Sequence, residues 1–232
     1  MHLLDTFSGK HLKICVAVPS PGIWITDFGL SLCHLMTAGL QFRIGQTKSQ
    51  ELQLFASTGS MLPRMRMEAV NHALETNADY LFMVDSDHKF PRKALHQLLS
   101  HGKDVVAVNC VTKTIPTNPT ARVKGPTVAG EIVQSLGRSG IEQVWRVGTG
   151  MMLVHMGVFR NIGAGVFDMF WRKDLKTYQG EDWSMCEAME KAGYKIWVDH
   201  DLSNEVTHIG QLHYLHSMSE AAMTTEGIAA NG

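Results

Sequence analysis

Two aspartates that follow an apolar run are the first candidates for chemistry in this sequence. Residues 80–84, Tyr-Leu-Phe-Met-Val, have the composition of a buried strand, and Asp85 and Asp87 come directly after them. Side chains two positions apart on an extended backbone point the same way, so both carboxylates are expected to reach one cation. Open α/β sheets bind their ligands at the carboxyl ends of parallel strands. Oxygen ligands suit Mg²⁺ or Mn²⁺, and these ions in turn suit a diphosphate.

The same short pattern also has a purely structural interpretation. Asp87 could cap a helix that Pro91 opens, with both carboxylates in a solvated turn. A second copy, Asp199 and Asp201, also follows a predicted strand, so the pattern alone does not identify a site. We take the second copy as a supporting or solvated pair, because it lacks the strand setting of the first.

The composition of the chain limits the class of protein. Its 232 residues, 44% hydrophobic and 19% charged, predict one globular domain with a sizeable core. A net charge of −1 gives no electrostatic case for a broad nucleic-acid or membrane surface. The four cysteines have neither zinc-like nor redox-like spacing, and are expected to be free, mostly buried thiols. No signal peptide and no membrane-spanning run is recognisable, so we expect a cytoplasmic protein without a membrane anchor.

Apolar runs alternate with helical patterns along the chain. This alternation predicts a Rossmann-like α/β/α sandwich with a mostly parallel central sheet. We expect the domain to cover residues 1–216 and residues 217–232 to form a flexible tail. The predicted strands cover residues 13–18, 40–44, 52–56, 80–85, 105–108, 143–147, 151–155 and 194–198, and the predicted helices 27–38, 60–74, 91–101 and 180–192.

Residues 112–143 have no sustained period and form a long irregular stretch. Stretches of this length inside a domain are usually functional or mobile. Lys113, Arg122 and Lys124 give it positive charge, which suits either an anionic partner or a solvated loop.

Four segments, taken in order, resemble the GT-A class of nucleotide-sugar-dependent glycosyltransferases, particularly family-2-like enzymes of phage and bacterial genomes. The similarity spans about residues 13–210, nearly the whole chain. The segments are the strand and loop 16–20 with Pro19-Ser20, the strand ending in Asp85-Ser86-Asp87, the Val147-Gly-Thr-Gly150 break, and Gly180-Glu-Asp-Trp183 followed by Thr207-His-Ile-Gly210.

The resemblance implies a metal site and a catalytic base. Asp85 and Asp87 would hold Mn²⁺ or Mg²⁺ against the diphosphate of the nucleotide, and His208 would complete the metal shell. Asp87 would be the direct ligand, and Asp85 would face the ribose or bind the metal through a water. Asp182 would be the general base that removes the proton of the acceptor hydroxyl. Glu181 would orient one of the sugars. A helix cap is the structural alternative for Glu181 and Asp182, at a helix start where the dipole favours carboxylates.

The resemblance also implies a donor site. Arg66 would lie near the diphosphate or the first acidic residue, with Arg64 as its rival, and a surface salt bridge is the alternative for both. Trp171 and Trp183 would stack on an acceptor ring or belong to the core or a lid. The implied donor-binding residues are Pro19, Ser20, Arg66, Asp85, Ser86, Thr149 and Gly150.

The implied activity is transfer of a sugar from a nucleotide-diphospho-sugar, first of all a UDP-sugar, to an acceptor hydroxyl. The acceptor stays open between a modified DNA base and a glycan. One alternative is a nucleotidyltransferase that makes the sugar nucleotide, although the loop Pro19–Gly22 lacks the cation expected there. The other alternative is a non-catalytic domain that binds a nucleotide-sugar.

Overall fold

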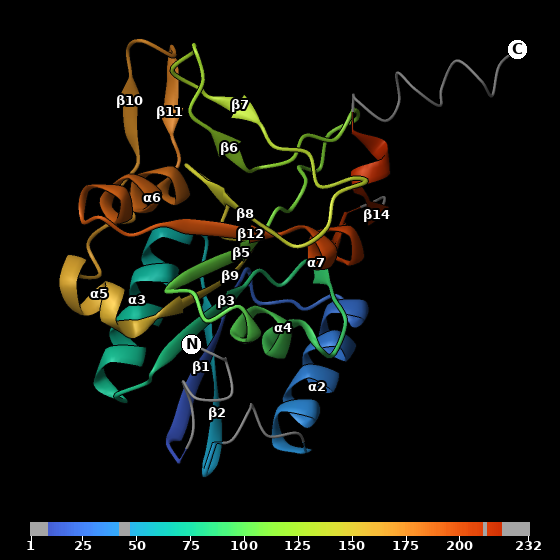
Figure 1. Ribbon diagram of the computed structural model, residues 1–232, viewed down its shortest axis with the longest axis vertical. Coiled ribbons are helices and arrows are strands. Elements are labelled where there is room, and N and C mark those ends of the chain that lie inside the picture. The colour runs from blue at the N-terminus through green and yellow to red at the C-terminus, as the bar shows by residue number, and fades with distance from the viewer. Residues whose placement is uncertain (1–8, 42–46, 211–212, 220–232) are drawn as a thin grey trace, which may run out of the picture.

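The computed structural model describes residues 9–41, 47–210 and 213–219, with a seven-stranded sheet at its centre (Figure 1). In spatial order the strands are β2 (Ser49–Thr58), β1 (His11–Ser20), β3 (Tyr80–Val84), β9 (Met151–His155), β5 (Val105–Val108), β12 (Ile196–Asp199) and β8 (Ile141–Val144). Strands β2, β1, β3, β5 and β12 run the same way, and β9 and β8 run against their neighbours. The predicted α/β class with a mostly parallel sheet is confirmed.

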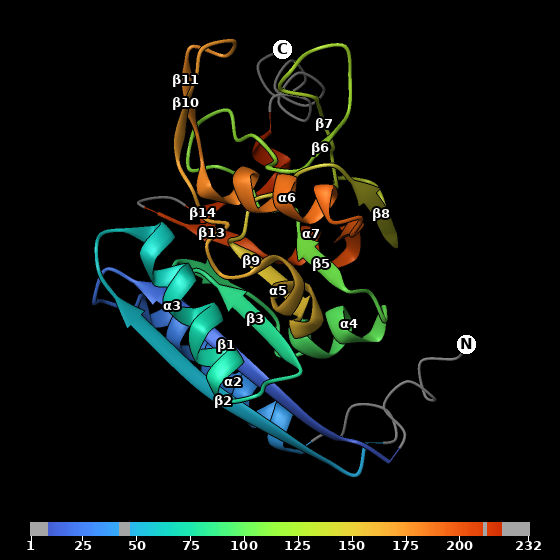
Figure 2. The same cartoon turned by 90° about the vertical axis from the view of Figure 1, so that its left-hand side faces the viewer.

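Helices cover both faces of the sheet (Figure 2). Successive residues of β1 serve the two faces in turn: Ile14 and Val16 belong to one hydrophobic cluster, Cys15 and Ala17 to the other. This double burial explains why the central strands are continuous apolar runs. No helix in the described ranges is long and apolar enough to span a membrane. Helices α3 (Leu62–Glu75), α5 (Met156–Ile162) and α6 (Glu181–Lys191) pack on one face, and α2 (Thr26–Gln41), α4 (Ala94–Ser100) and α7 (His200–Glu205) on the other.

Three small sheets and a short helix complete the fold. The sheet that matters for the site is antiparallel and joins β4 (His88–Lys89), β13 (Thr207–Ile209) and β14 (His213–Tyr214). Its register places His88 directly opposite His208. Two hairpins stand at the upper end in Figure 1. They are β6 (Arg122–Val123) with β7 (Glu131–Ile132), and β10 (Phe170–Arg172) with β11 (Thr177–Gln179); η1 (His216–Met218) follows β14.

The predicted strand at residues 40–44 is wrong where the structure describes it. Helix α2 does not end at Gly39 but continues through Leu40 to Gln41, and residues 42–46 lie outside the described ranges. Gly39 is there for packing: a Cβ atom on it would lie 2.1 Å from Cδ1 of Leu52 on β2. The glycine therefore lets helix and strand approach closely instead of terminating the helix.

The ordered domain extends slightly beyond its predicted end at residue 216. The backbone N–H of Thr117 donates to the carbonyl of Met218 at 2.8 Å, and Ser219 is buried. The first three residues of the predicted tail are therefore part of the fold. The remainder, residues 220–232, lies outside the described ranges.

Candidate functional site

The first predicted motifs meet at the carboxyl edge of the sheet. Because β1 and β3 are parallel neighbours, the loops that follow them lie side by side. A cavity of about 240 Å³ opens between these loops and the start of α3. It thus brings together four predicted donor-binding residues and Asp87. Its lining residues are Pro19, Ser20, Pro21, Gly59, Ser60, Leu62, Met65, Asp85, Ser86 and Asp87.

Asp85 is bound by an arginine and is not part of the metal-type cluster. Both of its carboxylate oxygens lie 3.2 Å from Nη2 of Arg66, which is 3% exposed. Nη1 of the same guanidinium donates to Glu181. Strand β3 ends at Val84 and the chain turns at Ser86, so the alternation that would align the two aspartates no longer applies. The structure therefore gives Asp85 no direct place in that cluster, and its expected role at the ribose, or at the ion through a water, stays a prediction.

Asp182 is a mostly buried carboxylate beside this ion-pair network. It lies in the first turn of α6, next to Glu181, and its Oδ1 accepts the backbone N–H of Trp183 at 2.7 Å. Burial, and then the carboxylate of Glu181, raise the pKa of Asp182 above its ordinary value. A carboxylate of this kind is a stronger base than an exposed one.

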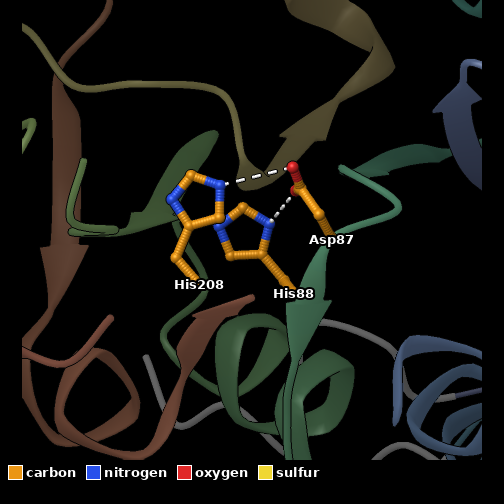
Figure 3. A group of neighbouring side chains, drawn as sticks. All are labelled: Asp87, His88 and His208. Atoms are coloured by element: carbon orange, nitrogen blue, oxygen red, sulfur yellow. Dashed lines mark ion pairs between the residues drawn. The ribbon is translucent and has the colours of Figure 1, made fainter. Parts of the chain in front are cut away.

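Asp87, His88 and His208 form a cluster of metal-ligand type (Figure 3). One potential ligand atom from each residue lies within 4.8 Å of the others. The two imidazole rings stack with centroids 4.3 Å apart and planes 9° apart. Nδ1 of His88 lies 3.1 Å from Oδ1 of Asp87 without the geometry of a hydrogen bond. Oδ1 of Asp87 and both ring nitrogens of His88 are thus buried polar atoms without a hydrogen-bond partner.

The hydrogen bonding of His208 directs a lone pair at Asp87. Nδ1 of His208 lies 2.6 Å from the carbonyl oxygen of Val111, which can only accept, so Nδ1 carries a proton. In the neutral ring Nε2 is then an acceptor, and it faces Oδ2 of Asp87 at 3.4 Å. Two facing acceptors need a cation or a proton between them. In metal-binding histidines, the nitrogen that does not bind the metal often donates to a backbone carbonyl in this way.

Lys113 brings a positive charge from the irregular stretch to the cluster. Its ammonium group forms an ion pair with Oδ2 of Asp87. Burial acts to raise the pKa of Asp87, but protons on the facing nitrogens of His208 and His88, together with the ammonium group of Lys113, outweigh it and hold the pKa well below its ordinary value. Asp87 is therefore an ionised, ligand-competent carboxylate. It does not cap α4, whose N-cap, Lys93, makes no side-chain capping bond.

Thr149 and Gly150 lie beneath the aspartate turn rather than on an open surface. The carbonyl of Gly150 accepts the backbone N–H of Asp85 at 2.9 Å, and Thr149 is 1% exposed. A Cβ atom at position 150 would lie 2.9 Å from Cε1 of His88. The glycine therefore makes room for the His88 ring, and its contact with the donor, which the resemblance implied, stays a prediction.

The second Asp-x-Asp pair is structural. Asp199 is fully buried and caps α7, because its Oδ1 accepts the backbone N–H of Leu202 at 2.8 Å. Its Oδ2 accepts from Gln97 at 2.8 Å and lies 2.7 Å from Nε2 of His101. Asp201 accepts the backbone N–H of Gly140 at 2.8 Å. Every oxygen of Asp199 is used by the fold.

The other cationic and aromatic residues considered in the sequence lie at different places in the structure. Arg64 is exposed and pairs with Glu68 on the surface of α3, so Arg66 is the arginine of the site. Lys124 pairs with Glu190, away from the aspartate turn. Arg122 donates to the carbonyl groups of the irregular stretch itself. Trp183 is half-buried against Arg146, and Trp171 is 50% exposed on the β10–β11 hairpin.

His88 was not identified from the sequence as a member of the cluster. Nothing in the pattern separated it from the other eleven histidines of the chain except its place directly after Asp87. With neutral histidines, the charges around the cavity sum to −2, because four carboxylates face two cations. The carboxylates are Asp85, Asp87, Glu181 and Asp182, and the cations are Arg66 and Lys113.

Comparison with known proteins supports the fold and no particular activity. No protein-family model matches the chain, and no curated protein matches it. Among solved structures, A197 from STIV is similar with a TM-score of 0.59 and 15% sequence identity, covering 90% of this chain and 92% of A197. Similarity at this level of identity shows a shared fold, and folds of this kind carry many different functions.

Proposed function

We propose that this protein is a metal-dependent glycosyltransferase that uses a nucleotide-diphospho-sugar, first of all a UDP-sugar, and an acceptor hydroxyl. One observation carries the proposal: the Asp87–His88–His208 cluster, with its buried polar atoms lacking partners, lies beside the cavity at the end of β1 and β3. A divalent ion there would balance the charge of −2 and offset the charge that develops on a leaving diphosphate.

The donor atoms favour Mn²⁺ over Mg²⁺. Two imidazole nitrogens and one carboxylate oxygen suit a transition-metal ion, whereas Mg²⁺ prefers oxygen ligands. The Asp87, His88 and His208 side chains would hold the ion. This set differs from the paired aspartates of the sequence-based prediction, because Asp85 is occupied by Arg66.

Asp182 is the best candidate for the general base. Asp85 and Glu181 are both held by the guanidinium of Arg66, so neither can accept a proton without losing that ion pair. Among the described residues, no cation makes a hydrogen bond with Asp182, and its raised pKa makes it a stronger base than an ordinary aspartate. Arg66 would therefore fix two carboxylates in place while the third reacts.

The first experiment measures thermal unfolding with UDP, GDP, CDP and TDP, each with Mn²⁺, with Mg²⁺ and without metal. We expect one nucleoside diphosphate to raise the Tm only when Mn²⁺ is present, with Mg²⁺ giving a smaller rise. If no nucleotide stabilises the protein in a metal-dependent way, the proposal is wrong. Stabilisation by a nucleoside triphosphate with a sugar 1-phosphate would instead favour the nucleotidyltransferase alternative.

The second experiment replaces Asp182 by Asn and follows release of nucleoside diphosphate from the stabilising donor. We expect binding to persist and turnover to fall by about 10²–10⁴-fold, the usual contribution of a general base. Asp201→Asn is the matched control, since Asp201 accepts a hydrogen bond from the backbone N–H of Gly140 and belongs to the other Asp-x-Asp pair. Retained turnover in Asp182→Asn would make Asp182 a helix-start residue only, and binding without turnover in the unaltered protein would favour the non-catalytic alternative.

The acceptor class is tested with the same readout. Hydroxymethylated DNA and neutral oligosaccharides are supplied in turn with the donor. Turnover with DNA that falls steeply between 50 and 200 mM salt would identify a nucleic-acid acceptor, because phosphate contacts release counterions. Turnover with an oligosaccharide at either salt concentration would identify a glycan.

A further inference from the structure

Lys113 makes the one contact between the Asp87–His88–His208 cluster and a lysine or arginine among the described residues. Its ammonium group pairs with Oδ2 of Asp87, the oxygen that also faces Nε2 of His208. Lys113 therefore lies on the ligand side of Asp87, where a metal ion shared with His208 would bind. A resident ammonium group and a metal ion would compete for the same carboxylate oxygen.

The backbone around Lys113 is held by hydrogen bonds, whereas its side chain is partly exposed. The backbone N–H of Thr112 donates to the carbonyl of Asn118 at 2.9 Å, and Val111 pairs with Pro119 across the base of the turn. The carbonyl of Val111 also holds His208. The Lys113 side chain itself is 37% exposed and ends a flexible four-carbon stem. Its ammonium group can thus change partner without a change in the fold.

Electrostatics gives the direction of that change. A divalent ion on Asp87 and His208 would neutralise the carboxylate and repel the nearby ammonium group, since like charges a few Å apart interact strongly in a partly buried site. Lys113 would then be an unpaired cation beside a positively charged metal centre. An anion with two or more negative charges, such as a diphosphate, would pair with both the metal ion and the ammonium group.

We propose that Lys113 is a donor-positioning residue that pairs with Asp87 in the metal-free protein and transfers to the diphosphate when the metal binds. This inference rests on the proposed function and adds a coupling to it. Because metal binding releases Lys113, and the released Lys113 binds the diphosphate, each ligand strengthens the binding of the other. The coupling follows from one side chain with two alternative anionic partners.

The test is Lys113→Met, which keeps the apolar stem and removes the charge. Isothermal titration calorimetry with Mn²⁺ alone should show binding about 3- to 10-fold tighter than in the unaltered protein, because the competing ammonium group is gone. Titration of inorganic pyrophosphate into the Mn²⁺-loaded protein should show binding about 10-fold weaker, because a charge-assisted contact is lost. The two affinities therefore change in opposite directions.

Lys124→Met is the matched control. Lys124 belongs to the same irregular stretch and also forms an ion pair, but with Glu190 instead of Asp87. Both affinities should stay unchanged in this variant, and thermal unfolding checks that both variants fold.

Three results would overturn the inference. Affinities that fall together, or that do not change, in Lys113→Met would show that Lys113 does not exchange partners, while the metal site itself would stand. The same shifts in Lys124→Met would mean that the effect is one of general charge. A chain that binds no Mn²⁺ at all would overturn this inference together with the proposed function.

Discussion

The chain carries the same three-residue pattern twice, and the two copies behave in opposite ways. At Asp199 both carboxylate oxygens are taken by a helix N-terminus, a glutamine and a histidine. At Asp87 one oxygen has no hydrogen-bond partner among the described residues, and the other pairs with Lys113 and faces Nε2 of His208. The copy at Asp199 completes the fold, and the copy at Asp87 leaves electron pairs that the fold does not use.

The histidines next to each pair show the same contrast. His200 uses both ring nitrogens, at 3.0 Å from Oγ of Ser135 and 3.0 Å from Oε2 of Glu142. Among the described residues, neither ring nitrogen of His88 has a hydrogen-bond partner, although the residue is 1% exposed and Nδ1 lies 3.1 Å from Oδ1 of Asp87. A buried polar group without a partner costs free energy, so its persistence calls for a ligand. The two copies have the same sequence spacing, and they differ in whether their buried polar atoms have hydrogen-bond partners.

The largest expected effect is at the first copy. Asp87→Asn removes the charged ligand and should abolish Mn²⁺ binding, lowering affinity by at least about 100-fold. The free energy of unfolding in the absence of metal should change by about 1 kcal/mol or less, because the Asp87 side chain is 30% exposed and its ion pair is partly solvated. Calorimetry with Mn²⁺ and urea unfolding measure the two quantities. Unchanged Mn²⁺ affinity would remove the distinction between the copies.

The second copy should give the reverse result. Asp199→Ala removes a helix cap and a buried carboxylate with several partners, and should lower the free energy of unfolding by about 3 kcal/mol. Mn²⁺ affinity should not change. Asp201→Ala, which loses a single hydrogen bond at the exposed end of α7, is the control and should cost about 1 kcal/mol or less. Equal costs for Asp199 and Asp201 would contradict the structural role given to Asp199.

The smallest effect is a pH dependence at Asp199. Burial alone would raise its pKa, but His101, the N–H of Leu202 and Gln97 lower it below the ordinary value. The folded state therefore binds fewer protons than the unfolded state. The stabilisation is complete above about pH 4, the ordinary pKa of Asp, and is lost as the pH falls through the folded value. In urea unfolding, the difference between the unaltered protein and Asp199→Asn should narrow below pH 4; a constant difference would exclude this linkage.

Much of the fold can be predicted from the sequence because buried strands require apolar residues. The runs at 80–84 and 105–108 are apolar at every position because β3 and β5 are covered on both faces. Strand direction imposes no such requirement, and nothing in residues 151–155 indicates that β9 runs against β3 and β5. Gly39 misled the prediction because a glycine required for close packing looks the same in sequence as one that ends a helix.

The site was only partly predictable for a related reason. Residue types indicated Asp87 and His208, and both belong to the cluster. The assignment of Asp85 extended the strand periodicity past Val84, where β3 ends. His88 was missed because its partner lies far along the chain and is defined by strand pairing, which sequence spacing does not reveal.

The pairing of β4 with β13 means that the metal-type cluster can form only after the strands of the central sheet have been synthesised. All seven strands of the central sheet lie within residues 11–199, whereas His208 follows them. Once the first two hundred residues have been synthesised, every strand of the central sheet is present, but His208 of the metal-type cluster is not. The cluster thus forms when β13 pairs with β4, and an ion bound there would hold these two strands together.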